Sequence, residues 1–86
     1  MDYCLITFSS THAAISAQKA LEGICPTLVM PVLREISMGC GIAVRFDPPY
    51  FEAVQTVLAQ TALPRASYAF YGVTGSGSQL SARPLE

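Results

Sequence analysis

The hexapeptide YCLITF, residues 3–8, is the stretch that decides the fold. Side chains of a strand point alternately to its two faces, and both faces of this segment are largely apolar. The two faces are Cys4, Ile6 and Phe8, and Tyr3, Leu5 and Thr7. The pattern predicts a central strand that is buried on at least one side.

The segments that follow alternate between helix and strand signals. Hydroxyl side chains at residues 9–11 and alanines at helical spacing predict a helix over residues 11–23, which Gly23 ends. Asp47 and Pro48 are typical of a helix start, and that second helix is expected to reach about Ala62. Further strands are predicted over residues 27–32, 41–46 and 67–73.

The order βαββαβ predicts an α+β protein. Right-handed crossovers favour a ferredoxin-like two-layer sandwich with an antiparallel sheet in the order 4-1-3-2. Residues 1–73 would form this single domain, and the Gly/Ser-rich residues 74–86 a flexible tail. With both helices on one side, the open sheet face is expected to be partly apolar and is a candidate surface for a homo-oligomer. Its expected residues are Tyr3, Leu5, Val29 and Tyr68.

Composition excludes several classes of partner. The 86 residues are 51% hydrophobic and 13% charged, with a net charge of −1 and five Lys plus Arg. Phosphate binding needs clustered cations, so no nucleic-acid partner is expected. No apolar run is long enough to span a membrane. The N-terminal residues lack the basic region of a signal peptide, which favours a cytoplasmic location.

Three cysteines, Cys4, Cys25 and Cys40, are too few and too widely spaced for a disulfide framework. The chain has neither a Cys-x-x-Cys pair nor a His/Cys cluster, so we expect neither a metal nor another cofactor. Cys4 is expected to pack in the core. Cys25 precedes Pro26 and opens a strand rather than a helix, and we interpret it as a structural or secondary thiol.

Cys40 stands apart because it lies between Gly39 and Gly41, within PVLREISMGCGIAVRF, residues 31–46. Flanking glycines widen the backbone conformations available and leave no neighbouring side chain to shield the sulfur. Arg34 and Arg45 are the nearby cations that could lower the pKa of a thiol. Two interpretations stay open: a loop cysteine packed beside a tight turn, or an accessible, activated thiol.

Two motifs, LITFSSTHA at residues 5–13 and PVLREISMGCGIAVRFDP at residues 31–48, resemble those of the selenium/sulfur carrier protein-like family. The resemblance covers about residues 3–73. It implies that Cys40, the cysteine of the S-x-x-C-G motif, is the carrier residue. The motif's arginine and glutamate fall on Arg34 and Glu35.

Two hypotheses follow for the function. In the first, Cys40 holds a persulfide or perselenide, stabilised by Arg34, Arg45 and the Gly39 and Gly41 backbone. His12, Glu35 and Ser37 are further candidates for lining this site, and the partners would be sulfur or selenium donor and acceptor proteins. This favours a carrier over a stand-alone enzyme. In the second, the domain is a non-catalytic module that binds a ligand or a protein.

Overall fold

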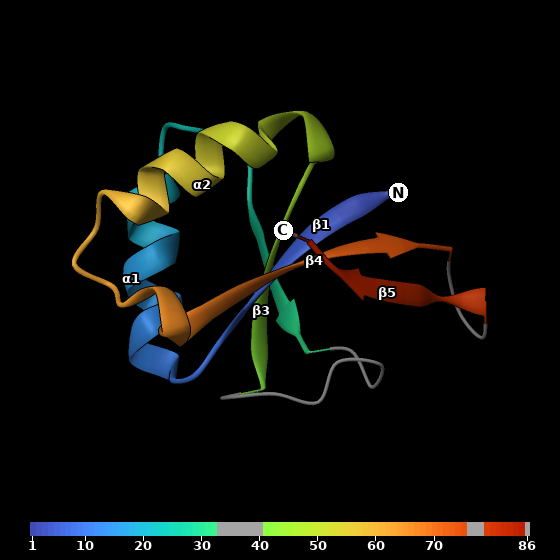
Figure 1. Cartoon of the computed structure of the whole chain (residues 1–86), viewed down its shortest axis with the longest axis horizontal. Helices are drawn as coiled ribbons and strands as arrows, with labels where there is room; N and C mark the ends of the chain where they lie inside the picture. Colours follow the sequence, from blue (N-terminus) through green and yellow to red (C-terminus); the bar gives the residue numbers. More distant parts are fainter. Residues whose placement is uncertain (33–40, 76–78, 86) are drawn as a thin grey trace.

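The computed structural model describes residues 1–32, 41–75 and 79–85 (Figure 1). Its elements are β1 (Tyr3–Phe8), α1 (Thr11–Leu21), β2 (Leu28–Pro31), β3 (Ile42–Phe46), the 3-10 turn η1 (Pro48–Tyr50), α2 (Phe51–Ala59), the 3-10 turn η2 (Arg65–Ser67), β4 (Tyr68–Thr74) and β5 (Ser81–Pro84). The strands form one five-stranded antiparallel sheet in the order β2-β3-β1-β4-β5. The predicted mixture of two helices and an antiparallel sheet is therefore confirmed.

The sheet differs from the predicted four-stranded ferredoxin-like order 4-1-3-2 because β5 extends it beyond β4. The prediction of a flexible tail over residues 74–86 is wrong for β5 and Leu85. Residues 81–84 pair with residues 71–74, and the Leu85 N–H donates to the Phe70 carbonyl at 2.9 Å. The segment alternates only briefly, with Leu80, Ala82 and Pro84 interleaved with Ser81 and Arg83, after a Gly/Ser-rich run. It is held by the backbone groups that the edge of β4 offers.

Local sequence signals explain both ends of α1 and the start of α2. Ser10 is the N-cap of α1, and its hydroxyl accepts a hydrogen bond from the Ala13 N–H at 3.1 Å. Gly23, with φ +79°, follows the end of that helix. The second helix begins later than predicted, at Phe51, because the two prolines after Asp47 form η1.

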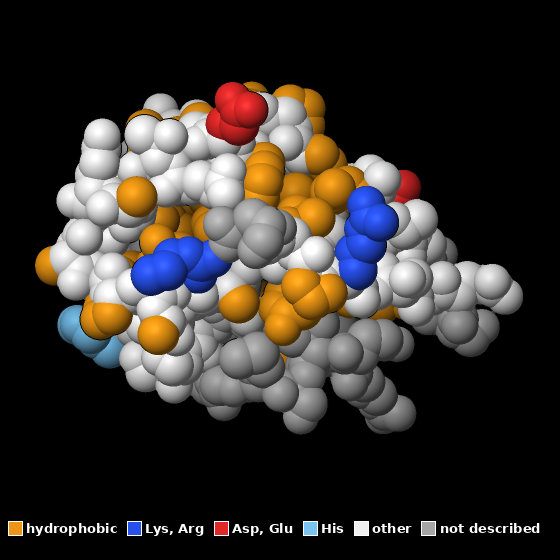
Figure 2. Space-filling view, in the orientation of Figure 1, with side chains coloured by type: hydrophobic (Ala, Val, Ile, Leu, Met, Phe, Trp, Pro, Cys, Tyr) orange, Lys and Arg blue, Asp and Glu red, His pale blue; other side chains and the backbone are white. Residues whose placement is uncertain are grey.

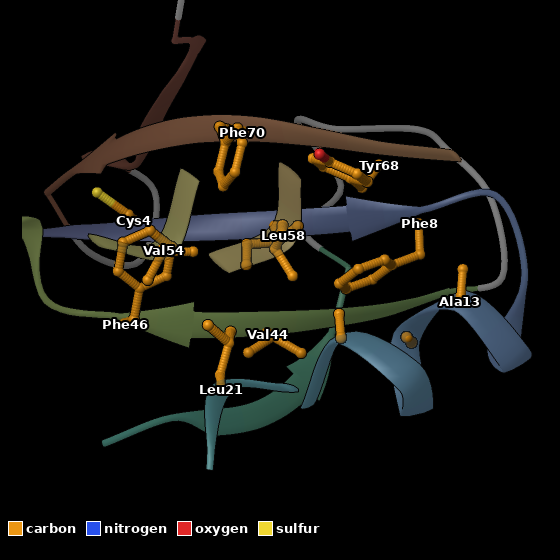
Figure 3. Packing of buried hydrophobic residues seen from close by; sticks show 13 residues of the cluster. Cys4, Phe8, Ala13, Leu21, Val44, Phe46, Val54, Leu58, Tyr68 and Phe70 are labelled. Atoms are coloured by element: carbon orange, nitrogen blue, oxygen red, sulfur yellow. The ribbon is translucent and has the colours of Figure 1, made fainter. Parts of the chain in front are cut away.

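The main core lies between the helices and one face of the sheet (Figure 3). Strand β1 occupies the centre, pairs with β3 and β4, and is buried along its whole length. Its side chains Cys4, Ile6 and Phe8 enter this core. Phe70 of β4 packs edge-to-face against Phe51 of α2, with ring centroids 5.4 Å apart, which anchors that helix to the sheet.

The opposite sheet face holds a second, smaller cluster. It consists of the buried residues Tyr3, Leu5, Ala43 and Val73, with Met30, Val32, Tyr71, Leu80 and Ala82 half-buried against them. Two of those half-buried side chains, Leu80 and Ala82, come from the C-terminal segment that the sequence excluded from the fold.

The predicted composition of the open face is correct for two residues and wrong for the other two. Tyr3 and Leu5 lie on that face but are only 8% and 0% exposed. Val29 pairs with Val44 and so shares the face of the main core, and Tyr68 belongs to the main core itself. The homo-oligomer through this face stays a prediction, without the apolar residues on which it was based.

Charges on the surface are sparse. On the side of the molecule drawn in Figure 2, the Lys and Arg side chains form two separate groups with hydrophobic side chains between them. No helix in the described part of the chain combines the length and apolar character needed to cross a bilayer.

Leu85 offers a direct test that the C-terminal segment belongs to the fold. Its half-buried side chain packs against the main core. We expect Leu85→Ala to lower the free energy of unfolding by about 1–2 kcal/mol in urea denaturation, since it deletes the half-buried isopropyl group of the side chain. The control is Leu28→Ala in strand β2, where the leucine is 58% exposed and the loss should be much smaller. Equal, negligible losses for both variants would contradict the packing of Leu85.

Candidate functional site

The two ends of the connection that carries the family motif lie side by side. The Val32 N–H after β2 donates a hydrogen bond to the Gly41 carbonyl before β3, at 3.0 Å. Cys40 is the residue directly before Gly41 in the sequence. Five predicted site residues lie outside the described residues: Arg34, Glu35, Ser37, Gly39 and Cys40.

The backbone conformation at position 41 favours glycine. Its φ is +82°, in the region that side chains disfavour, and it is exposed. No heavy atom lies within 4 Å of the position that a Cβ would take. A substitution here would therefore strain the backbone without meeting a steric clash.

His12 lies at the same end of the sheet as Gly41. It is exposed in the first turn of α1, which follows the end of β1. Strands β1 and β3 are antiparallel, and Thr7 near the end of β1 pairs with Ala43 near the start of β3. The fold thus brings the α1 N-terminus and the start of β3 to the same end of the sheet.

Arg45 lies at the far end of β3. It is four residues from Gly41 along an extended strand, which corresponds to about 13 Å. Its guanidinium carbon stacks over the Tyr3 ring, 4.1 Å from the centroid. Arg45 pairs with Leu5, so Tyr3 lies still farther from the Gly41 end of the sheet. The structure does not bring Arg45 and Gly41 together, and the role of Arg45 toward the Cys40 thiolate stays a prediction.

The other two cysteines are in environments that favour the neutral thiol. Cys4 is 0% exposed, and its thiol donates to the Met1 Sδ at 3.7 Å. Burial raises the pKa of Cys4; the N-terminal ammonium opposes this and Asp47 adds to it. Burial and then Asp47 raise the pKa of Cys25 as well, and this side chain is only partly exposed. Both thiols are therefore poor nucleophiles at neutral pH.

Comparison with known proteins bears on the same part of the chain. The model of the family described as "Putative Se/S carrier protein-like" matches residues 3–68. The chain belongs to the Se/S carrier protein-like family. The matched region runs from β1 to the start of β4 and contains the whole connection between β2 and β3. No curated protein and no solved structure matches this chain.

No group of three or more His, Cys, Asp or Glu side chains among the described residues is arranged to hold a metal ion. The Se/S carrier-like chain does, however, contain a polar group that the sequence analysis did not single out. Thr7 is 0% exposed, and its hydroxyl has no hydrogen-bond partner among the described residues. It lines a cavity of about 40 Å³ between the end of β1 and the start of β4. The only signal in the sequence is a hydroxyl within an otherwise hydrophobic strand.

The Thr7 hydroxyl can be tested by an isosteric substitution. A buried hydroxyl without a partner destabilises the folded state, so Thr7→Val should raise the free energy of unfolding by about 1 kcal/mol. Thr7→Ser keeps the hydroxyl, loses a methyl group and should not stabilise. Urea denaturation of the three proteins measures the difference. A clear loss of stability in Thr7→Val would show that the hydroxyl has a partner.

Proposed function

We propose that this protein carries sulfur or selenium as a persulfide or perselenide on Cys40. The observation that carries the proposal is the family match over residues 3–68, which includes this cysteine. Cys40 is favoured over the other two cysteines because burial raises the pKa of both Cys4 and Cys25. A carrier thiol must be ionised and reachable, and neither of those side chains meets both conditions.

Loading would be a transfer of sulfane sulfur between thiols. The Cys40 thiolate attacks the terminal sulfur of a donor protein's persulfide and forms a new S–S bond. The donor's own S–S bond breaks, and its sulfur leaves as a thiolate that takes up a proton. Unloading is the same exchange in reverse, with an acceptor's thiolate attacking the terminal sulfur on Cys40. Neither step consumes an oxidant or a reductant, and selenium would follow the same exchange.

Within this proposal, Arg34 is the cation that lowers the pKa of Cys40, and the Gly39 and Gly41 backbone N–H groups contribute further stabilisation. Glu35, Ser37 and His12 remain candidates for lining the site. His12 is kept because it is exposed at the α1 N-terminus and lies at the same end of the sheet as Gly41. Arg45 is not included, because it lies toward the other end of β3.

The partners of such a carrier would be donor and acceptor proteins, and a cytoplasmic location would keep the thiol reduced. The exposed, side-chain-free Gly41 next to Cys40 would allow a partner's active site to approach. The scaffold would be a ferredoxin-like sandwich to which β5 has been added.

Thiol reactivity tests the assignment of Cys40. At neutral pH, alkylation read out by intact mass and peptide mapping should modify Cys40 first and Cys4 last, since the thiolate is the reacting species. After incubation with a persulfide donor, the mass of one sulfur atom should appear on Cys40. Cys40→Ser should abolish the gain, whereas Cys25→Ser should retain it. Equal labelling of Cys40 and Cys4, or a sulfur gain that survives Cys40→Ser, would contradict the proposal.

The two arginines provide a matched pair of variants. Arg34→Gln should slow alkylation of Cys40 several-fold at neutral pH by raising the pKa of its thiol, because an opposite charge favours the ionised form. Arg45→Gln removes the same charge and should leave the rate unchanged, since the guanidinium stacks on Tyr3 toward the other end of the strand. The pH dependence of the alkylation rate measures both. A larger effect from Arg45→Gln would contradict the assignment of these roles.

A further inference from the structure

A groove lies at the end of β3 away from Gly41, where β2 begins. It is open to solvent and has a volume of about 310 Å³, at the lower end of the range for small-molecule sites. Its lining residues are Pro26, Thr27, Leu28, Arg45, Phe46 and Asp47. It therefore combines one cation, one anion and apolar side chains within a small space.

The N–H groups along the edge of the Arg45 guanidinium have no hydrogen-bond partner among the described residues. The Tyr3 ring contacts the flat face of the guanidinium at 4.1 Å, which engages no N–H group. No ion pair or hydrogen bond to this guanidinium occurs within the described residues. The stacking also limits the rotation of a long side chain, so less conformational entropy is lost when a ligand binds.

Asp47 is the matching anion. It directly follows β3 in an extended conformation, and although it occupies the N-cap position of η1, its side chain forms no capping hydrogen bond. It is exposed, and no described residue donates a hydrogen bond to its carboxylate. Asp47 and Arg45 both line the groove and are two residues apart on extended backbone, about 7 Å between their Cα atoms, so they offer opposite charges to one ligand.

We propose that this groove binds a free α-amino acid with an aliphatic or thioether side chain. The α-carboxylate pairs with Arg45 in the bidentate geometry that a guanidinium favours, and the α-ammonium pairs with Asp47. The side chain lies against Pro26 and Leu28, the latter 58% exposed without a ligand. A simple anion would meet the charge of Asp47 and a simple cation that of Arg45, whereas a zwitterion satisfies both.

This inference does not depend on the chemistry of Cys40. It gives a physical basis to a ligand-binding module, and one small domain can carry both sites because they lie toward opposite ends of β3. The groove takes its walls from β2 and β3, so the ligand would contact the two strands whose other ends lead into the family motif.

Titration with leucine, followed by two-dimensional amide NMR of the full chain, tests the proposal. We expect saturable shifts at Thr27, Leu28, Phe46 and Asp47 with leucine up to about 10 mM, a range suited to millimolar affinity. Arg45→Gln and Asp47→Asn should each weaken binding about tenfold, the effect of losing one charge-assisted hydrogen bond. Arg83→Gln on β5 and Glu52→Gln on α2 remove exposed charges elsewhere and should leave the affinity unchanged.

Modified ligands separate the two charges. N-acetyl-leucine lacks the ammonium and leucine amide lacks the carboxylate, so both should bind more weakly than leucine. Asp47→Asn should weaken leucine but not N-acetyl-leucine. The proposal is overturned if the groove amides show no saturable shift, if Arg45→Gln and Asp47→Asn bind leucine as tightly as the natural protein, or if both modified ligands match leucine.

Discussion

Burial of β1 on both faces is the constraint on which the rest of this structure depends. All six residues of the strand are buried, with the helices above one face and a smaller apolar cluster below the other. A large apolar side chain gains about 1.5–3 kcal/mol from full burial, so these residues together supply much of the stability expected of a small domain. The buried backbone N–H and C=O groups of β1 form their hydrogen bonds by pairing with β3 on one side and β4 on the other. This pairing fixes the order of the three central strands.

The elements with strong patterning could be predicted from the sequence. Alternation in residues 3–8 separates the two faces of β1 correctly, and helical spacing of alanines locates α1. The C-terminal strand could not be found this way. Residues 81–84 alternate polar and apolar side chains too briefly to stand out after a Gly/Ser-rich run, and they are ordered by pairing with β4, an interaction between segments that local patterns do not encode. The mistaken open face has the same origin, because Leu80 and Ala82 from that segment help to cover it.

Some functional residues can be recognised from local sequence, whereas others depend on the pairing of distant segments. Cys40 and its glycines stand out because chemistry and flanking residues are local properties of the chain. Arg45 is only five positions from Cys40 in the sequence, yet extended backbone carries it far along β3, and its stacking on Tyr3 depends on the pairing of β1 with β3. Asp47 is a typical N-cap residue by sequence, but two prolines produce a short 3-10 turn, and the carboxylate is left without that role. Thr7 shows its unpaired hydroxyl only once both neighbouring strands are in place.

The hydrogen bond from Val32 to Gly41 has a consequence for how this scaffold can change. It joins the two described ends of the connection that precedes β3. A loop anchored in this way can be lengthened, shortened or exchanged at an entropic cost that grows only slowly with its length. Transplanting the segment into another hairpin with the same closure would therefore be a reasonable engineering route.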